Sequence, residues 1–356
     1  MKKAFFLLLL VSIVLNLKSQ DYDMLKITTG VPFLTIVPDA KSGAMGDIGA
    51  ATTSDLSSIF HNASKYAFTD KKFGIQISNS PWLRKIASDM AIYYITGYYK
   101  INDNQAFAAS LKYFSIGEIQ FTNELGENVI GHKPNEFALD VAYSMKLTET
   151  FSGAIVLKFI YSNLTGGYTN STGSSRSGIG IAVAGDLSFF YHKPIMIKNN
   201  DAEINWGINL SNLGTKINYG TNATTFIPSN LKTGVGFKYI FDEFNSLELG
   251  FDLNKLMVPT PATYNNDGVI VNGTDPEVSV PEGIIRSFYD GQSFMEEFYE
   301  LTFGTGLEYS YSDRFFLRGG LFYESPQKGG RRYLTTGLGF RFSVFDIDFS
   351  YLAPIY

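Results

Sequence analysis

The stretch LELGFDLN (residues 247–254) places a large apolar residue at every second position, with a polar or very small residue between. A period of two is the pattern of a β-strand that has one apolar face and one polar face. The same alternation runs through FALDVAYSMK (137–146), INWGINLS (204–211) and FDIDFSY (345–351). These stretches predict a protein built mainly from two-faced strands.

Two features of these strands favour a membrane barrel over a soluble β-sandwich. Most strands approach the roughly 9–11 residues with which a tilted strand crosses a bilayer. Their ends carry aromatic pairs such as Tyr98-Tyr99 and Phe322-Tyr323, as interfacial girdles do. We therefore expect an all-β, transmembrane outer-membrane β-barrel over residues 73–356, with a soluble secreted sandwich as the alternative. The expected strands lie near 73–82, 89–100, 105–117, 135–146, 151–163, 177–190, 203–211, 231–241, 246–256, 299–311, 314–324, 332–342 and 345–353.

The connections between these strands alternate in length, as they do in bacterial barrels with short periplasmic turns and longer outer loops. The long outer loops are expected at 118–134, 164–176, 212–230 and 257–298. The pattern predicts thirteen strands, whereas single-chain bacterial barrels have an even number. Either a further strand lies near residues 269–271, or the closing strand is missing from this sequence.

Composition and charge narrow the class of protein. The chain of 356 residues has no cysteine, three histidines and a formal net charge of -5. These values argue against a disulfide framework, a thiolate metal site and nucleic-acid binding. Residues 1–20 combine Lys2 and Lys3 with an apolar run that ends at Leu17, the layout of a secretory signal peptide. We expect an exported protein that carries neither a cofactor nor a metal.

Residues 32–68 read PFLTIVPDAKSGAMGDIGAATTSDLSSIFHNASKYAF, and this block resembles the N-terminal signature of the PorV (LptO) family of the type IX secretion system. Asn62-Ala63-Ser64 departs from the family's Asn-Pro-Ala, and Lys41 stands where Arg is common. The resemblance implies a barrel like that of the transporter FadL, with about fourteen strands and a chain that continues into one more strand. The other similar segments are VPEGIIRSFYDG (280–291), EYSYSDRFFLRGGLFYES (308–325) and TTGLGFRFSVFDIDFSYLAP (335–354).

The resemblance also implies a role. PorV-like proteins accept secreted cargo that bears a C-terminal targeting domain as it leaves the SprA/Sov-type translocon barrel. They pass this cargo to an attachment complex that contains the sortase-like PorU, and they perform no chemistry themselves. The implied partners are these proteins and outer-membrane lipid, and nucleic acid is not among them. The alternative is a FadL-like outer-membrane transporter of hydrophobic small molecules.

Residues 21–72, between the signal peptide and the first strand, are expected to form a plug or periplasmic segment. The glycine spacing within it does not match the Gly-x-Gly-x-x-Gly loop that binds nucleotides. Glycine instead permits a tight, irregular backbone in the barrel mouth, and aspartates there can cap backbone amides. The residues expected to build the plug are Pro32, Phe33, Pro38, Asp39, Gly43, Gly46, Asp47 and Gly49.

Loop 257–298 is the longest insertion, and its second half predicts two short helices. Pro281 suits the first position of a helix, and Ser293-x-x-Glu296 matches a capping box. Long loops tend to carry function, so the loop is interpreted as a docking element for cargo or translocon. The equally weighted alternative is a lid packed on the barrel rim. The residues proposed for contact are Ile284, Ile285, Phe288, Tyr289, Phe294 and Phe298.

Polar residues on the inward side of the strands could line a solute path. The interpretation we favour is that these mixed charges pair with one another and with the plug. A hydrolase would need an assembled nucleophile, base and orienting group, and the three histidines are scattered along the chain, so we expect no catalytic residues. The expected lumen-lining residues are Asp140, Asn205, Glu248, Asp252, Arg318 and Arg341.

Overall fold

The computed structural model describes residues 26–83, 89–122, 128–164, 166, 178–220, 223–291 and 293–355. The predicted signal peptide (1–20) and nearly all of the predicted loop 164–176 lie outside the described residues. Within the described ranges, no helix combines the length and the apolar character that a membrane crossing requires.

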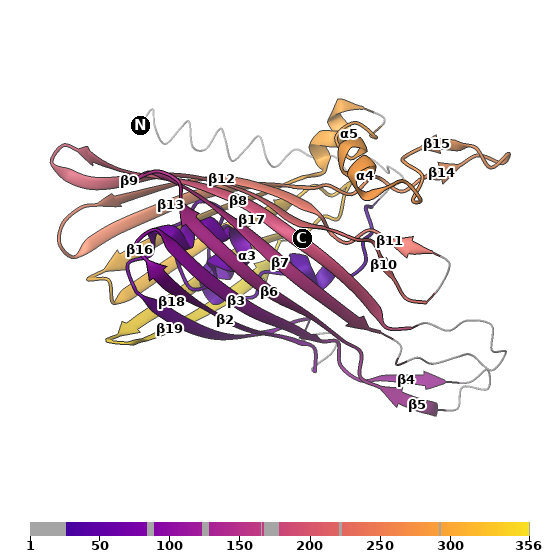
Figure 1. The fold of residues 1–356 in the computed structure, drawn as a ribbon, viewed down its shortest axis with the longest axis horizontal. Helices are drawn as coiled ribbons and strands as arrows, with labels where there is room; N and C mark the ends of the chain where they lie inside the picture. Colours follow the sequence, from indigo (N-terminus) through magenta and orange to yellow (C-terminus); the bar gives the residue numbers. More distant parts are fainter. Residues whose placement is uncertain are drawn as a thin grey trace.

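One antiparallel sheet of thirteen strands dominates the molecule and confirms the predicted strands and fold class (Figure 1). Each strand pairs with the next large strand of the chain, so the spatial order follows the sequence. The strands are β1 (Phe73–Pro81), β2 (Ala91–Asn102), β3 (Gln105–Ser115), β6 (Asn135–Lys146), β7 (Phe151–Asn163), β8 (Gly180–Ile197), β9 (Asn200–Gly214), β12 (Asn230–Ile240), β13 (Asn245–Leu256), β16 (Leu301–Tyr311), β17 (Phe315–Glu324), β18 (Arg332–Phe342) and β19 (Phe345–Pro354).

Three small hairpins project from the long connections at one end of the barrel, which we call the outer end (Figure 1). They are formed by β4 (Ile119–Thr122) with β5 (Asn128–His132), β10 (Ile217–Asn218) with β11 (Thr224–Thr225), and β14 (Thr263–Tyr264) with β15 (Ile270–Asn272). The suggestion that residues 269–271 contribute a further barrel strand is therefore wrong. The chain turns back at Asn265, whose amide bonds the carbonyl of Val269, so β15 pairs with β14.

The barrel is open in this structure. All neighbouring strands are antiparallel, so β1 and β19, the first and the last of thirteen, run in the same direction. Their outer edges are not paired with each other in the described sheet. At the opposite end, which we call the turn end, β8 and β9 extend to Ile197 and Asn200, beyond the limits of 190 and 203 that the alternation predicted.

The two faces of the wall have opposite chemistry. On β13, Leu249 and Phe251 point outward and remain 44% and 43% exposed, whereas Glu248 and Asp252 point inward and are buried. A soluble protein would bury the apolar face and expose the charged one. This arrangement fits a barrel that is surrounded by lipid, and the single curved sheet rules out the sandwich alternative for the described chain.

The interior of the barrel is occupied by the luminal segment, which we define as residues 26–72 (Figure 1). It enters at the outer end, where the amide of Gly30 bonds the carbonyl of Phe226, and it leads into β1 at the turn end. Its short α2 packs on β17, β18 and β19, and its η2 packs on β2, β3, β6, β7 and β8. The segment comprises η1 (Pro32–Thr35), α2 (Ala40–Ala44), α3 (Ser58–His61) and η2 (Ala63–Phe68).

Candidate functional site

Two inward carboxylates of β13 hold the backbone of the luminal segment. One Oδ of Asp252 accepts hydrogen bonds from the amides of Gly49 and Ala50, at 2.8 and 2.9 Å. Glu248 accepts from the amide of Thr53 at 2.6 Å and from its hydroxyl at 3.0 Å. Hydrogen bonds to a charged acceptor are about twice as strong as neutral ones, so these two positions anchor the segment to the wall.

A second contact joins the luminal segment to the neighbouring strands through a histidine. Asp39 caps α2 by accepting from the amide of Ser42 at 2.9 Å, and its other oxygen lies 3.3 Å from Nε2 of His61. The opposite ring nitrogen lies 3.3 Å from Nζ of Lys232 on β12. Asn209 of β9 donates to the carbonyl of His61 at 3.0 Å. Through these contacts His61 positions α2 and α3.

Glycines on both sides let the luminal backbone lie directly on the wall. Gly46 has φ +70, and a Cβ there would meet the carbonyl of Thr305 at 2.6 Å. A Cβ on Gly320 of β17 would meet the amide of Gly46, and one on Gly49 would enter the ring of His61. Gly43 has room, since its nearest neighbour is 3.6 Å away. Two of the three regularly spaced glycines are thus required by packing.

The remaining residues expected in the plug lie toward the outer end of the interior. Phe33 is fully buried and stacks on Phe114, with 6.3 Å between the ring centroids. Pro32 begins η1 and is exposed, and the carbonyl of Pro38 accepts from the hydroxyl of Ser80 at 3.4 Å. Asp47 accepts a hydrogen bond from the hydroxyl of Tyr333.

The other four residues expected to line the lumen bond to wall neighbours. Asp140 accepts from the hydroxyl of Ser110 at 3.2 Å, and Asn205 lies 2.8 Å from a ring nitrogen of His192. Arg318 pairs with Glu308 at 2.5 Å and with Asp348, and Arg341 pairs with Asp346 at 3.2 Å. Lys232, Tyr333 and Thr335 also hold the luminal segment and were not singled out from the sequence, although each lies inward on a predicted strand.

Loop 257–298 forms the two expected helices, α4 (Val280–Arg286) and α5 (Phe294–Tyr299). The hydroxyl of Ser293 accepts from the amide of Glu296 at 3.2 Å, as the capping-box pattern predicted. Gly283 of α4 packs against Phe226 and Pro259, which places this helix at the rim. Ile284, Ile285, Phe288 and Tyr289 lie on α4 and the turn that follows it, whereas Phe294 and Phe298 lie on α5.

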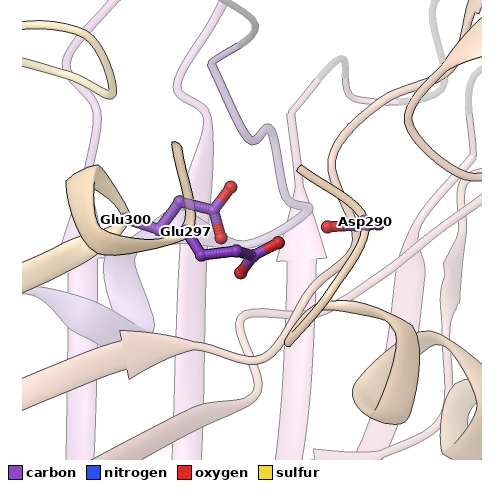
Figure 2. Close-up of side chains that lie close together, drawn as sticks. All are labelled: Asp290, Glu297 and Glu300. Atoms are coloured by element: carbon purple, nitrogen blue, oxygen red, sulfur yellow. The ribbon is translucent and has the colours of Figure 1, made fainter. Parts of the chain in front are cut away.

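Three acidic side chains converge between these helices: Asp290, Glu297 and Glu300 (Figure 2). Lys255 of β13 lies 2.9 Å from Glu297 and also pairs with Glu300, and Lys328 lies 2.9 Å from Glu300. The two ammonium groups pair with Glu297 and Glu300, and these ion pairs tie α5 to the barrel wall. Burial raises the pKa of Asp290, which accepts from the amide of Thr260 at 2.8 Å.

Comparison with known proteins agrees with this architecture. The family model described as "Type IX secretion system protein PorV" matches residues 18–263, more than half of the chain. The chain belongs to the PorV family. It is therefore an outer-membrane component of the type IX secretion system. Among curated proteins, none matches the chain.

Solved structures similar to this PorV-family chain are FadL-like outer-membrane channels. A TodX deltaS2S3 mutant monoaromatic hydrocarbon channel is 12% identical, with a TM-score of 0.50 over 88% of this chain and 92% of that one. The Pseudomonas putida toluene transporter TodX is 11% identical over 87% and 90%, with a TM-score of 0.48. A Pseudomonas aeruginosa FadL homologue is 11% identical over 92% and 90%, with a TM-score of 0.43. At these identities the likeness concerns the fold alone.

Proposed function

We propose that this protein receives secreted cargo bearing a C-terminal targeting domain from a SprA/Sov-type translocon and passes it to a PorU-type attachment complex. The observation that carries the proposal is the family match over residues 18–263. The filled interior supports it, because a polypeptide that meets this barrel finds the lumen occupied by buried residues such as Phe33 and Tyr66. Cargo contact is therefore assigned to the outer loops.

The luminal segment acts in this proposal as a permanent plug. Asp252 and Glu248 supply four hydrogen bonds to it from one strand, and Tyr333 and Thr335 supply further bonds from β18. Such a seal would let the barrel remain in the outer membrane without opening a pore while it handles cargo.

The docking surface in this proposal is α4 together with the β14–β15 hairpin at the outer end. Ile285 and Tyr289 are 61% and 65% exposed there, and Val271 on the hairpin is 61% exposed. Ile284 and Phe288 complete the apolar surface. Large exposed apolar side chains on a rim are typical of a protein interaction site.

Cargo capture by loop variants tests the proposal. An Ile285→Ser/Tyr289→Ser double variant is expected to retain less C-terminal-domain cargo in a pull-down from mild detergent, while the barrel assembles normally. A matched control is Lys133→Ser, an exposed polar change in outer loop 118–134, outside the proposed docking surface. Capture of cargo and translocon at the parent level by the double variant would remove this surface from the account.

A FadL-like transport function is the second candidate, because an apolar cluster lies in the outer half of the lumen. Val31, Phe33, Ile92, Phe114 and Ile160 form a buried cluster there, and a similar fold occurs in a structure named as a monoaromatic hydrocarbon channel. A deletion strain distinguishes the two functions. Lost uptake of hydrophobic compounds with normal export of surface proteins supports transport, and the reverse supports secretion.

We further propose that the protein performs no chemistry of its own. Its described histidines with inward positions are engaged in positioning contacts, His61 with Asp39 and His192 with Asn205. Replacing each by Gln is expected to leave cargo processing unchanged as long as the barrel assembles.

A further inference from the structure

Helix α5 has the opposite arrangement to a helix on the surface of a soluble protein. Glu297 of α5 and Glu300, which ends the helix as its C-cap, face the barrel wall, and Glu300 is only 5% exposed. The apolar residues of α5, Phe294, Met295 and Phe298, lie outside this ion-pair network and are 83%, 51% and 46% exposed. An amphipathic helix in water turns its apolar side to the protein, so this orientation indicates an apolar medium around α5.

The acidic side of α5 covers a lysine on the outer surface of the barrel. Lys255 lies opposite Leu301 in the register of β13 and β16, two positions beyond the Leu253–Phe303 pair. Since side chains alternate between the faces of a strand, Lys255 lies on the outward face with Leu249 and Phe251. It is 5% exposed because Glu297 and Glu300 close over it.

The apolar side of α5 continues the lipid-facing belt without a break. The ring of Phe298 lies 6.1 Å from that of Phe303 on β16, and Phe303 lies 6.1 Å from Phe251 on β13. Phe303 has the same outward orientation as Leu307, which is 43% exposed on the same strand. The helix thus lies against the outside of the wall, and its aromatic residues extend a surface that already faces lipid.

The height of this contact fits the outer membrane interface. A strand rises about 3.3 Å per residue, and a tilt near 40° leaves about 2.5 Å of height per residue. Tyr311 lies at the turn end of β16, and Phe303 and Leu301 lie toward the outer end. Phe303 is therefore about 20 Å and Leu301 about 25 Å above Tyr311, at the upper limit of a belt that is about 25 Å tall.

We infer that α5 is an interfacial anchor that inserts Phe294, Met295 and Phe298 into the outer leaflet, in the lipid headgroup and upper acyl region. The ion pairs of Lys255 and Lys328 hold the helix on the wall while its aromatic side binds lipid. This inference goes beyond the proposed function, since it concerns the lipid around the barrel and involves no cargo. It separates α5 from the rim surface formed by α4.

Spin labels in lipid nanodiscs test the inference. The chain has no cysteine, so Phe294→Cys and Met295→Cys each give a single labelling site on the full-length protein. Leu307→Cys serves as a lipid-belt reference and Asp267→Cys as an aqueous reference at the tip of the β14–β15 hairpin. Collisions with oxygen report lipid, and collisions with a water-soluble nickel chelate report water.

In nanodiscs of phosphatidylethanolamine and phosphatidylglycerol, the labels at positions 294 and 295 are expected to collide with nickel severalfold less often than the label at 267. Their oxygen collisions are expected to approach those at 307. Nickel accessibility equal to that at 267 for both α5 sites would overturn the inference and leave the aromatic side to a protein partner. If the protein captured no cargo while the labels at 294 and 295 were protected by lipid, only the proposed function would be contradicted.

Discussion

Replacing Asp252 by Ala is expected to release the luminal segment from the wall while the barrel stays assembled. In the structure, one Oδ of Asp252 accepts from the amides of Gly49 and Ala50, at 2.8 and 2.9 Å. Lys232 lies 4.0 Å from the same oxygen. The substitution leaves two buried amides without their acceptor and removes the negative charge that faces Lys232.

The magnitude follows from the number and kind of bonds. Each hydrogen bond to a charged group is worth about 1.5–3 kcal/mol, so the two bonds together contribute about 3–6 kcal/mol to docking of the segment. A change of about 1.4 kcal/mol is tenfold in an equilibrium, which makes the undocked population at least about 100-fold larger. Asp252→Asn keeps an acceptor but loses the charge, so we expect about half of this loss in free energy.

A buried cysteine can report this opening, because the parent chain has none. Ser57 is 1% exposed within the luminal segment, and its hydroxyl donates to Gln76 at 3.1 Å. Labelling of Ser57→Cys by a maleimide in detergent measures the undocked fraction. Asp201→Ala, at an exposed position on β9, is the matched control. Heat-dependent migration on SDS gels verifies that the barrel is assembled.

The result that would refute the reasoning is an unchanged labelling rate in Asp252→Ala. The interior would then be held closed without this carboxylate. If Asp201→Ala accelerated labelling of Ser57→Cys equally, the cause would be the general removal of an acid from the barrel and not the loss of the contact to Gly49 and Ala50.

Three further substitutions test other parts of the account. Gly320→Ala puts a methyl group against the backbone of Met45 and Gly46 and is expected to lower the free energy of unfolding by about 1–3 kcal/mol. In the control Gly319→Ala, the added methyl group has its nearest neighbour 3.9 Å away, so thermal unfolding should not change. Equal effects at both sites would contradict the packing argument. Lys255→Met removes the lysine partner of Glu297 and one of the two lysine partners of Glu300, so limited proteolysis between residues 286 and 300 should accelerate. Parent-like resistance to proteolysis would argue against the ion-pair tether. Leu249→Arg puts a charge on the lipid face and should cost about 2–4 kcal/mol in urea titrations of the reconstituted barrel, an effect that would vanish if this face met water.

Strand positions could be predicted from the sequence because each depends on a local pattern. The alternation in 247–254 needs no knowledge of any other segment, and the limits of β13 agree with it. The turn ends of β8 and β9 were missed because Lys193 and Asn200 stand where the alternation would require apolar residues, although backbone pairing continues to Ile197 and Asn200. Where two strands extend beyond the lipid belt, their backbones can pair although neither strand has an apolar face.

The contacts inside the barrel could not be predicted in the same way. Asp252 and Gly49 are 203 positions apart, and their meeting depends on the register of the intervening strands. The pattern places Asp252 inward, but it does not say which luminal amide the carboxylate will bind. Inward polar residues were therefore predictable as a class, and their partners were not.

Helix α5 shows a different limit. Its apolar residues at 294 and 298 were predictable as one side of a helix, and the pattern alone suggests that this side faces the protein. The signal that could have corrected the assignment is Lys255, which falls on the apolar face of strand 246–256. A lysine there requires either exposure to water or an acidic cover, and Glu297 and Glu300 provide that cover.

Affinity purification of the tagged protein from outer membranes in mild detergent tests the central claim most directly. The account predicts that detergent is needed for extraction and that a very large barrel and exported proteins with a C-terminal targeting domain co-purify with the chain. Release of the mature protein without detergent, or its recovery from outer membranes free of both partners, would contradict the account.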